Sequence, residues 1–499
     1  SHICELKSIK KSHIMKKSFL IFIPLKFIKF ITFLFFAFLF QSAAFGQVIT
    51  WGNSGGDSNS VSSLVSSGVV SIISTSSAYA ALKSDGSVVA WGEASRGGVG
   101  GVVSGLSSGV VKLISTNHAF AALKSDGSVV AWGLSSHGGS TTHPVDVSSF
   151  LTSGVIDIFS TENGFAALKA NGTIKAWGEF CGDVPLINAW YTDKVTSTRH
   201  GLLIENPKYS SGQWITEIGY FGCNDELFNA SDFNSNSGKN FTQVVTTSTA
   251  TAILKPNGSV YAWGDTATNR GSTFSFQNGV TDQTIASKLT TGVVKLFSNG
   301  QSIIALKNDG ALVGWGFPDW GGADINNGKT TTGDPSASII DIASNQKGYS
   351  SIMSDGSIIY WGATWLTPSS SVISSLSSGV VKVFGGDGGW AALKSDGSVV
   401  TWGESSQGGD SSTVSSMLLS GVISITSNNG AFAALKNDGS VVAWGNSYGG
   451  DISSVSGTLV DVKKIYTNGQ SFAALLNTNS APTNISLSSS SVNENVATG

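Results

Sequence analysis

A short sequence pattern that returns along most of the chain constrains its fold more than any other feature. Residues 80–92 read AALKSDGSVVAWG, and near copies occupy residues 121–133, 392–403 and 433–445. Looser copies place an aromatic residue, nearly always tryptophan before glycine, at positions 51, 91, 132, 177, 221, 263, 315, 361, 402 and 444. The spacing of these positions stays between 40 and 52 residues. A steady period with drifting sequence predicts a stacked or circular array of one supersecondary unit.

Each repeat unit has the features of short β-strands joined by tight turns. The runs AALK and SVVAW favour strands, and the Ser-Asp-Gly or Asn-Asp-Gly step between them is a strong hairpin signal. A third strand-like run follows each Trp-Gly step after about 17 residues, as at residues 108–115 and 378–384. The recurring tryptophan supplies a large apolar ring for the contact between neighbouring units. We therefore predict an all-β protein with at least three antiparallel strands in each unit.

The two ends of the repeat region complement one another. Residues 49–52 hold only the second half of a hairpin, whereas residues 471–476 hold only the first half. Pairing of these halves removes exposed sheet edges and closes the array into a ring. We predict a β-propeller of about ten units of ~41–45 residues, closed by its N- and C-terminal strands. Because propellers usually have four to eight blades, two smaller rings or units smaller than a blade remain alternatives.

Composition supports short strands joined by polar turns and argues against one class of partner. Charged residues make up 12% of the chain and hydrophobic residues 40%, and there are 61 glycines, which favours a folded, turn-rich protein over a disordered one. The net charge is −3 and basic blocks are missing. Since phosphate binding needs clustered lysine and arginine, we expect no nucleic-acid partner.

The N-terminal region is typical of an export signal. The first methionine is Met15, so residues 1–14 are interpreted as upstream sequence outside the fold. Residues 15–46 combine two early lysines, an apolar stretch and small residues at Ala44 and Gly46, the pattern of a cleaved signal peptide. In the alternative, an uncleaved anchor, Lys26 and Lys29 leave too short an apolar run for the ~20 residues of a spanning helix. We expect a secreted or cell-surface protein with no membrane insertion after cleavage.

The repeat resembles the family of regulator-of-chromosome-condensation (RCC1-like) repeats. The run VVKLIS followed by AALKSDGSVVAWG, as in residues 110–133, carries this resemblance, which covers residues 47–479 and is closest to bacterial secreted members. It implies a β-propeller whose loops form a protein-binding face, and it implies no catalytic residue. Family members usually have seven blades, so ten units depart from the pattern. WD40 repeats have a similar period, but their Gly-His and Trp-Asp signatures are missing.

The last segment, residues 480–499, is interpreted as a linker and the truncated start of another domain. Residues 481–487 and 491–495 resemble the first strand of a cadherin-like domain, in which an acidic residue helps to hold calcium. Glu494 stands at that position, so the resemblance implies calcium there, and we expect no other cofactor. A polar linker is the alternative. The end at Gly499 suggests a fragment of a longer surface protein.

The titratable residues form no pattern typical of catalysis, and we expect no enzymatic activity. None of the histidines after the signal segment recurs in the repeat or has metal-ligand spacing; they are His118, His137, His143 and His200. The repeated aspartate, lysine and tryptophan are explained by a turn, a solvated strand end and the core, respectively. The Gly-Gly-Asp linkers at Asp57, Asp410 and Asp451 lie where binding residues collect, but a calcium site needs several converging oxygens.

Residues 180–243 depart most from the repeat and are the predicted recognition region. An enlarged hairpin loop is expected at residues 206–212, and loop aromatics are typical of binding surfaces. Together with a second irregular linker at 317–334, this region supplies the candidate binding residues Trp190, Tyr191, Tyr209, Trp214 and Trp320. Cys181 and Cys223 occupy similar places in adjacent units, and an oxidising export route favours a disulfide between them. Local repacking of a decayed unit is the alternative.

These features predict a secreted or cell-surface binding or adhesion protein that recognises a protein or glycan through its propeller loops. An extracellular hydrolase or lyase acting on polysaccharide or peptide is one alternative. A spacer that displays adhesion domains further along the chain is the other.

Overall fold

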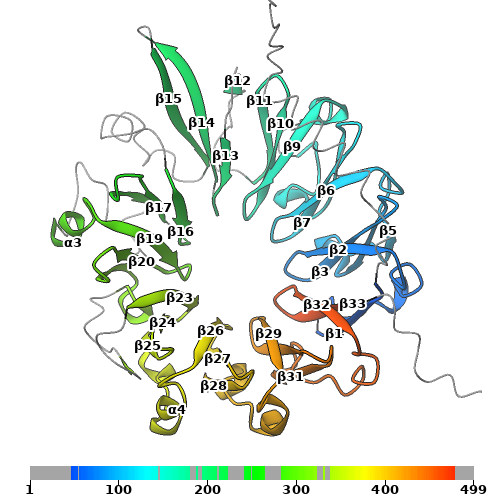
Figure 1. Cartoon of the computed structure of the whole chain (residues 1–499). Helices are drawn as coiled ribbons and strands as arrows, with labels where there is room; N and C mark the ends of the chain where they lie inside the picture. The colour runs from blue at the N-terminus through cyan, green and yellow to red at the C-terminus, as the bar shows by residue number, and fades with distance from the viewer. Residues whose placement is uncertain are drawn as a thin grey trace, which may run out of the picture. The chain divides into compact units, whose positions relative to one another are not determined.

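The described residues of the computed structural model form ten antiparallel sheets that follow one another around a ring (Figure 1). All of them belong to one compact unit, residues 45–499. The structure describes residues 46–53, 55–143, 146–179, 187–188, 194–199, 201–210, 213–222, 241–248, 250–264, 283–322, 330–331 and 338–477. The predicted signal peptide, the cadherin-like segment with Glu494, Trp190, Tyr191, Cys181 and Cys223 lie outside these residues. The predicted all-β propeller of about ten units is confirmed.

Each sheet contains an inner strand, which lies nearest the centre of the ring, followed by a middle and an outer strand (Figure 1). The inner strands of repeats 1 to 10 are β2 (Val69–Ser74), β6 (Val110–Ser115), β9 (Val155–Ser160), β13 (Lys194–Ser197), β16 (Gln243–Thr246), β19 (Val293–Ser298), β23 (Ile339–Asn345), β26 (Val380–Gly385), β29 (Val422–Ser427) and β32 (Val462–Thr467). The middle strands are β3 (Ala78–Lys83), β7 (Ala119–Lys124), β10 (Gly164–Lys169), β14 (Gly201–Ser210), β17 (Ala250–Leu254), β20 (Ser302–Lys307), β24 (Gly348–Met353), β27 (Gly389–Lys394), β30 (Ala431–Lys436) and β33 (Ser471–Leu476). The outer strands are β4 (Val88–Gly92), β8 (Val129–Gly133), β11 (Thr173–Gly178), β15 (Gln213–Gly222), β18 (Val260–Gly264), β21 (Leu312–Gly316), β25 (Ile358–Gly362), β28 (Val399–Gly403), β31 (Val441–Gly445) and β1 (Val48–Gly52).

The linkers, which the sequence predicts as polar turns, contain short helical turns and three two-residue strands. The added strands pair with the outer strands of repeats 1, 3 and 7 and are β5 (Gly101–Val102), β12 (Ile187–Asn188) and β22 (Thr330–Thr331). The 3₁₀ turns are η1 (Asn59–Val61), η2 (Ala94–Arg96), η3 (Ser135–His137), η4 (Phe150–Thr152), η6 (Pro318–Trp320), η7 (Thr364–Leu366), η8 (Ser405–Gln407) and η9 (Ser412–Leu418). The one-and-a-half-turn helices are α3 (Gln283–Lys288) and α4 (Ser370–Ser375).

The tenth sheet is built from both ends of the repeat region, as the split hairpin predicts. β1 pairs with β33 in antiparallel register, so that Trp51 lies opposite Phe472 and Val48 opposite Leu475. The indole N–H of Trp51 also donates to the carbonyl of Gly449 at 3.1 Å, which ties the first strand to the preceding repeat. Pairing of β1 covers the edge of β33 that a linear array leaves exposed.

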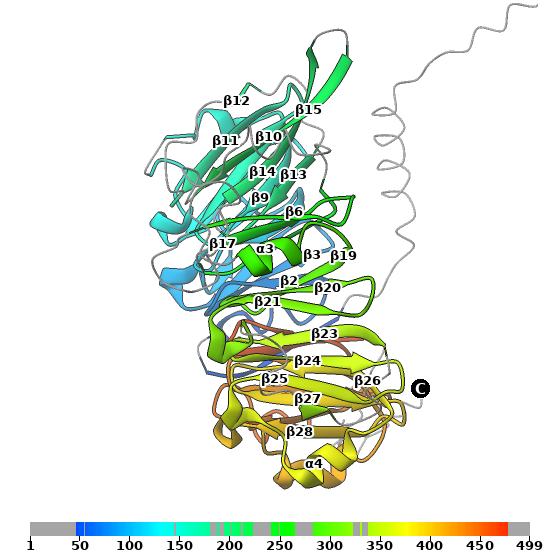
Figure 2. The same ribbon diagram turned by 90° about the vertical axis from the view of Figure 1, so that its left-hand side faces the viewer.

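The core lies between neighbouring sheets, which stack face to face (Figure 2). In one interface, Ala80 and Val88 of repeat 1 pack with Phe120 and Trp132 of repeat 2, all of them buried. Small alanines on the middle strand leave room for the large rings of the next repeat. The two alanines and one tryptophan that recur in each unit are therefore the residues that determine how neighbouring blades pack.

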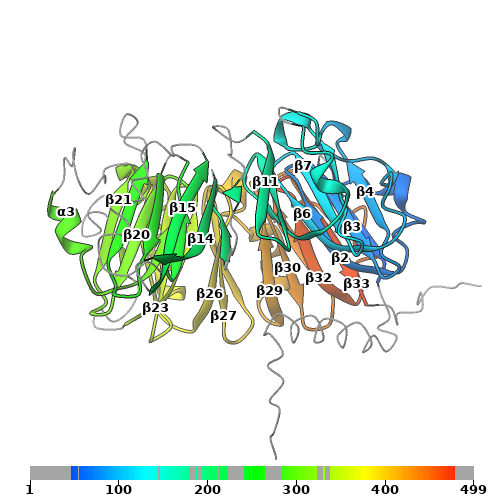
Figure 3. The same cartoon turned by 90° about the horizontal axis from the view of Figure 1, so that it is seen from above.

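The strands run between two ends of the ring, which carry different turns (Figure 3). The turns that join inner and middle strands form the inner-turn end, where the turn apices of several repeats donate a backbone hydrogen bond to the apex of the next repeat. The backbone N–H of Ser76 donates to the carbonyl of Asn117, that of Asn117 to Glu162 and that of Glu162 to Arg199. Each N···O distance is 2.9 Å. The same link joins Ser248 to Gly300 and Asn429 to Gly469. These bonds cross between repeats and tie together the apices of repeats 1 to 4, of repeats 5 and 6, and of repeats 9 and 10.

The opposite end of the ring carries the Asp-Gly-Ser turns. The Asp85 carboxylate accepts the backbone N–H of Ser87 at 2.9 Å and its hydroxyl at 2.6 Å, and Asp126, Asp396 and Asp438 do the same. The turn interpretation of this aspartate is confirmed. The lysine of Ala-Leu-Lys does more than end a strand, because Lys83 donates to the carbonyl of Leu64 at 2.8 Å and so holds the incoming linker.

These turns predict an acid-sensitive fold. Hydrogen bonds from Ser87 hold the pKa of Asp85 below its usual value of 3.8, and the corresponding serines lower the pKa of Asp126, Asp396 and Asp438. A carboxyl with a lowered pKa in the folded state stabilises the fold above pH 3.8, and this contribution is lost as the pH falls through the lowered values. We expect the unfolding temperature to drop below pH 3.8, and a variant with Ser128, Ser398 and Ser440 replaced by alanine to show a shallower drop. Calorimetry from pH 2 to 7 measures both, and identical pH profiles would contradict the assignment.

The predicted enlarged loop at residues 206–212 is wrong, because the extra residues lengthen two strands. β14 and β15 pair over ten residues each, from Gly201 opposite Gly222 to Ser210 opposite Gln213, and leave two residues for the turn. The hairpin extends beyond the other sheets at the edge of the ring (Figures 1 and 2). An extended ladder satisfies the backbone N–H and C=O groups of the insertion, which a long loop would leave to solvent.

Candidate functional site

The predicted recognition residues are distributed over several parts of the ring. The strand register places Tyr209 opposite Trp214, one pair from the tip of the long hairpin. Trp320 ends η6 and is half-buried, with its ring 5.0 Å from that of Phe317. Its carbonyl accepts hydrogen bonds from the side chains of Asn299 and Ser302. Trp320 therefore supports the inner turn of its own repeat, and the structure does not bring it together with the hairpin aromatics.

A groove of about 330 Å³ lies at the inner-turn end, across the inner turns of repeats 6 to 10. It runs from Ser298 and Asn299 in repeat 6 to Thr467 and Gly469 in repeat 10. No single loop builds it. Five turns that are about 40 residues apart in sequence line up side by side, and this alignment creates the groove. We call it the inner-turn groove.

One turn position differs between the two halves of the ring, and the groove lies across the half in which this position is asparagine or glycine. This position is threonine in repeats 1 to 5, at residues 75, 116, 161, 198 and 247, and asparagine or glycine in repeats 6 to 10, at residues 299, 345, 386, 428 and 468. The Thr75 hydroxyl accepts from Ala78 N–H and donates to the Arg96 carbonyl. Asn428 makes the same two links, with its oxygen accepting from Ala431 N–H at 2.8 Å and its nitrogen donating to the Tyr448 carbonyl at 2.6 Å.

The middle of the groove is opened by glycine. Repeat 8 carries Gly385 and Gly386 at two turn positions where the other repeats carry serine, threonine or asparagine. A Cβ at Gly385 would lie 2.6 Å from the Ser344 carbonyl oxygen, so only glycine permits this approach of neighbouring turns. The glycines leave backbone surface, rather than side chains, on the floor of the groove.

The polar groups at the apices of these turns are available for binding. Gln346 and Asn429 are exposed, and Asp387 is half-buried. Lys347 lies between two carboxylates, 3.9 Å from Asp387 and 3.6 Å from Glu404, so its positive charge offsets one of the two negative charges beside the groove. The arrangement presents amide, hydroxyl and carboxylate groups with little net charge. Such groups can exchange hydrogen bonds with a ligand that is rich in hydroxyl groups.

An exposed tryptophan at the same end of the ring was missed by sequence reasoning. Trp365 lies in η7 of repeat 7 and is 64% exposed. The linker that carries it begins at Ala363, whose N–H donates to the Lys347 carbonyl in the inner turn of that repeat. The available signal was its position four residues after Trp361, outside the repeating Trp-Gly step.

Two of the histidines lie side by side without forming a recognisable reaction centre. The rings of His118 and His137 are tilted by 56° with centroids 4.3 Å apart, and burial lowers the pKa of both below the usual 6.5. Within the described part of the chain, no group of three or more His, Cys, Asp or Glu residues is placed to hold a metal ion. In the same part, no helix is long and apolar enough to cross a membrane.

Comparisons with known proteins relate this chain to a fold. No family model and no curated protein sequence matches it. Yeast RCC1 (Prp20), solved with Kap60 bound to it, is 15% identical over 73% of this chain and 80% of that chain, with a TM-score of 0.33. Human WBSCR16 is 16% identical over 57% and 87%, with a TM-score of 0.32. The CRINKLY WD40 ectodomain of the Arabidopsis thaliana receptor kinase ACR4 is 15% identical over 66% and 90%, with a TM-score of 0.27. At low sequence identity, the chain is structurally similar to RCC1-like β-propellers.

Proposed function

We propose that this chain is an exported binding protein that recognises a glycan in the inner-turn groove. The observation that carries the proposal is the alignment of five inner turns into one groove, which combines the exposed amides of Gln346 and Asn429 with half-buried hydroxyls and the half-buried carboxylate of Asp387. Export follows from the signal pattern in residues 15–46. Binding, adhesion and display of the chain at a cell surface are all compatible with this function.

The chemistry of the groove favours sugar over a flat protein surface. Side-chain amides such as Gln346 and Asn429 both donate and accept hydrogen bonds, as sugar hydroxyls do. Binding sites are concave and are oriented by a few polar groups, whereas protein interfaces depend on apolar anchors at their centre. The exposed indole of Trp365 lies in the linker that begins at the same end of the ring, outside the residues that line the groove.

Paired substitutions test the groove directly. The full chain is passed over immobilised polysaccharides (cellulose, chitin, starch, pectin and alginate), and affinity for a retained one is measured by calorimetry with its oligosaccharides. A variant carrying Gln346→Ala and Asn429→Ala is expected to bind about tenfold to thirtyfold more weakly, because each lost hydrogen bond is worth roughly 1 kcal/mol.

A control from the same repeat makes this result specific. Asn437 is exposed like Asn429 but lies in the turn at the opposite end of the ring. Asn437→Ala is expected to leave affinity within twofold of the unmodified chain. Failure of every immobilised polysaccharide to retain the chain, or equal losses for the double variant and Asn437→Ala, would overturn the proposal.

A further inference from the structure

The inner strands carry a ring of aligned residues in which every second repeat presents lysine. The strand registers place ten residues, one from each inner strand, at one level of the ring. Each lies opposite the same position of its middle strand, which is the leucine of Ala-Leu-Lys in most repeats. In repeat order they are Ser71, Lys112, Asp157, Lys194, Gln243, Lys295, Asp341, Lys382, Ser424 and Lys464. Lysine occupies each even repeat, and an uncharged or acidic residue occupies each odd one. We call this level the lysine ring.

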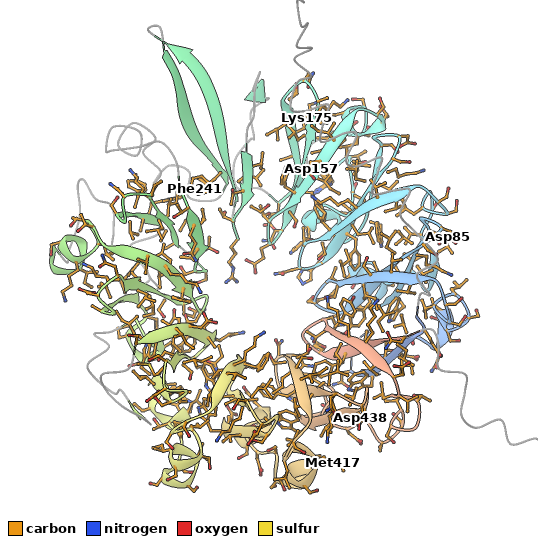
Figure 4. All side chains as sticks on the ribbon, viewed as in Figure 1. Asp85, Asp157, Lys175, Phe241, Met417 and Asp438 are labelled. Carbon is orange, nitrogen blue, oxygen red and sulfur yellow. The ribbon has the colours of Figure 1, made fainter. Side chains whose placement is uncertain are left out.

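Two of these lysines are neutralised by the next repeat. The ammonium of Lys112 pairs with Asp157 at 2.5 Å and also donates to the Ile158 carbonyl. Lys295 pairs with Asp341 at 3.1 Å. Asp157 lies on the inner strand β9 (Figure 4). In these repeats the ring is charge-balanced.

Two other lysines differ, because serine replaces aspartate in the repeat that follows each of them. Lys382 is followed by Ser424, and Lys464 by Ser71. Both lysines are exposed, and neither makes an ion pair with any residue that the structure describes. Lys463, the neighbour of Lys464, is exposed as well. One arc of the ring, from repeat 8 to repeat 10, therefore carries uncompensated positive charge in a chain whose net charge is −3.

Aromatic rings hold these ammonium groups in place. The Lys382 ammonium lies 5.0 Å from the centre of the Phe384 ring, and that of Lys464 lies 4.7 Å from the centre of the Tyr466 ring. A residue two positions further along a strand lies on the same face, so each ring supports the lysine beside it. Between them, β29 presents only the short side chains of Ser424 and Thr426. The result is two positioned ammonium groups, separated by a strand that presents only short side chains with hydroxyl groups.

This charged arc lies on the same strands that end in the inner-turn groove. β26, β29 and β32 contribute Gly385, Ser427 and Thr467 to the groove. Thr467 lies three positions after Lys464 on β32, about 10 Å away at the usual rise per residue. A chain-like ligand that occupies the groove and continues along the inner strands reaches both ammonium groups.

We propose that the inner-turn groove and the Lys382–Lys464 arc together bind an acidic oligosaccharide, whose carboxylate or sulfate groups lie against the two lysines; the inference rests on the proposed glycan-binding function. The groove supplies hydrogen bonds to sugar hydroxyls, and the arc supplies charge selection. A nucleic acid fits less well, because its continuous phosphates need a longer basic surface, and Asp157 and Asp341 interrupt the ring.

The test compares acidic and neutral probes on the full chain. An oligogalacturonate hexamer, the same hexamer with its carboxyl groups reduced to alcohols, a heparin hexasaccharide and a single-stranded DNA oligonucleotide are titrated at low and high salt. We expect at least tenfold tighter binding of one of the two acidic glycans than of the reduced hexamer, and a loss of this preference in high salt. The two acidic probes distinguish carboxylate from sulfate recognition.

Variants assign the preference to the arc. Lys382→Gln combined with Lys464→Gln is expected to lower the affinity for the acidic glycan at least tenfold and to leave binding of the reduced hexamer unchanged. The matched control, Lys112→Gln combined with Asp157→Asn, removes one lysine of the same ring together with its partner and is expected to change affinity less than threefold.

Several outcomes would overturn the inference, and they are distinguishable from failure of the proposed function. Equal affinity of the double lysine variant and the unmodified chain for the acidic glycan overturns it, as does lack of binding to both acidic probes. Lysine-dependent binding of DNA as tight as that of the glycan overturns the glycan assignment. If the reduced hexamer binds and responds to Gln346→Ala with Asn429→Ala, the glycan function stands while the acidic preference fails.

Discussion

Replacement of Trp51 by alanine is expected to lower the free energy of unfolding by about 3–5 kcal/mol, the usual cost of removing a buried large aromatic side chain. Trp51 is 3% exposed, stacks on Phe472 with ring centres 5.3 Å apart and donates its N–H to Gly449. It belongs to β1, the strand that closes the ring from the other end of the chain. Denaturant unfolding followed by tryptophan fluorescence measures the loss.

The same substitution is also expected to cause self-association, because weaker docking of β1 exposes the edge of β33. Trp444→Ala is the matched control. Trp444 is 2% exposed, stacks on Phe432 at the same 5.3 Å and donates to Gly408, but its strand belongs to a hairpin that is continuous in sequence. We expect a similar loss of stability for Trp444→Ala without concentration-dependent dimers in size-exclusion chromatography. Dimers in both variants, or in neither, would show that closure does not depend on β1.

The repeat, the strand number and the ring closure were predictable because their signals are local. An Asp-Gly turn between two apolar runs specifies a hairpin within thirteen residues, as in residues 80–92, and the unpaired halves at residues 49–52 and 471–476 are complete only together. The long β14–β15 hairpin was not predicted, because residues 206–217 lack the alternation of apolar and polar residues that marks a half-buried strand.

The inner-turn groove was not predictable from any single segment. It depends on five turns meeting side by side, and the register that aligns them is set by packing between repeats. The change from Thr75 and its counterparts to Asn428 and its counterparts is visible in the sequence, but its meaning appears only when the turns are placed at one end of the ring. The same holds for the lysine ring, whose two-repeat alternation emerges after each inner strand is aligned on its middle strand.

In the proposed function, ligand recognition depends on differences between repeats rather than on the repeat itself. The conserved part of each unit, from the Asp-Gly turn to the buried tryptophan, builds contacts between blades. Residues that vary in a regular order, such as Lys382 and Ser424 at one level, decide what the shared framework presents to a ligand. A ring of ten blades with one strand order offers ten corresponding positions, and exchange of a few residues on consecutive blades changes what these positions present without altering the buried residues.

A left-handed glycine that follows several of the 3₁₀ turns, namely η2, η3, η6 and η8, provides the second large expected effect. Gly408 has φ of +84°, its carbonyl accepts the N–H of Trp444, and a Cβ at this position would lie 2.5 Å from Cδ2 of Phe432. Phe432 is fully buried and stacked on Trp444, so its ring has no space into which to move. Gly408→Ala is expected to lower the free energy of unfolding by about 3 kcal/mol, the sum of a left-handed backbone penalty and overpacking.

Two other glycines separate the contributions of backbone and packing to this loss. Gly310 has φ of +82° with nothing within 4 Å of an added Cβ, so Gly310→Ala is expected to cost about 1 kcal/mol from the backbone alone. Gly101 has open space and no positive φ, and Gly101→Ala is expected to change stability by less than about 0.5 kcal/mol. Urea unfolding of the three variants gives the ranking. Equal losses for Gly408→Ala and Gly310→Ala would show that the contact with the next blade adds nothing, and that the packing between repeats is looser than the fit of Gly408 against Phe432 requires.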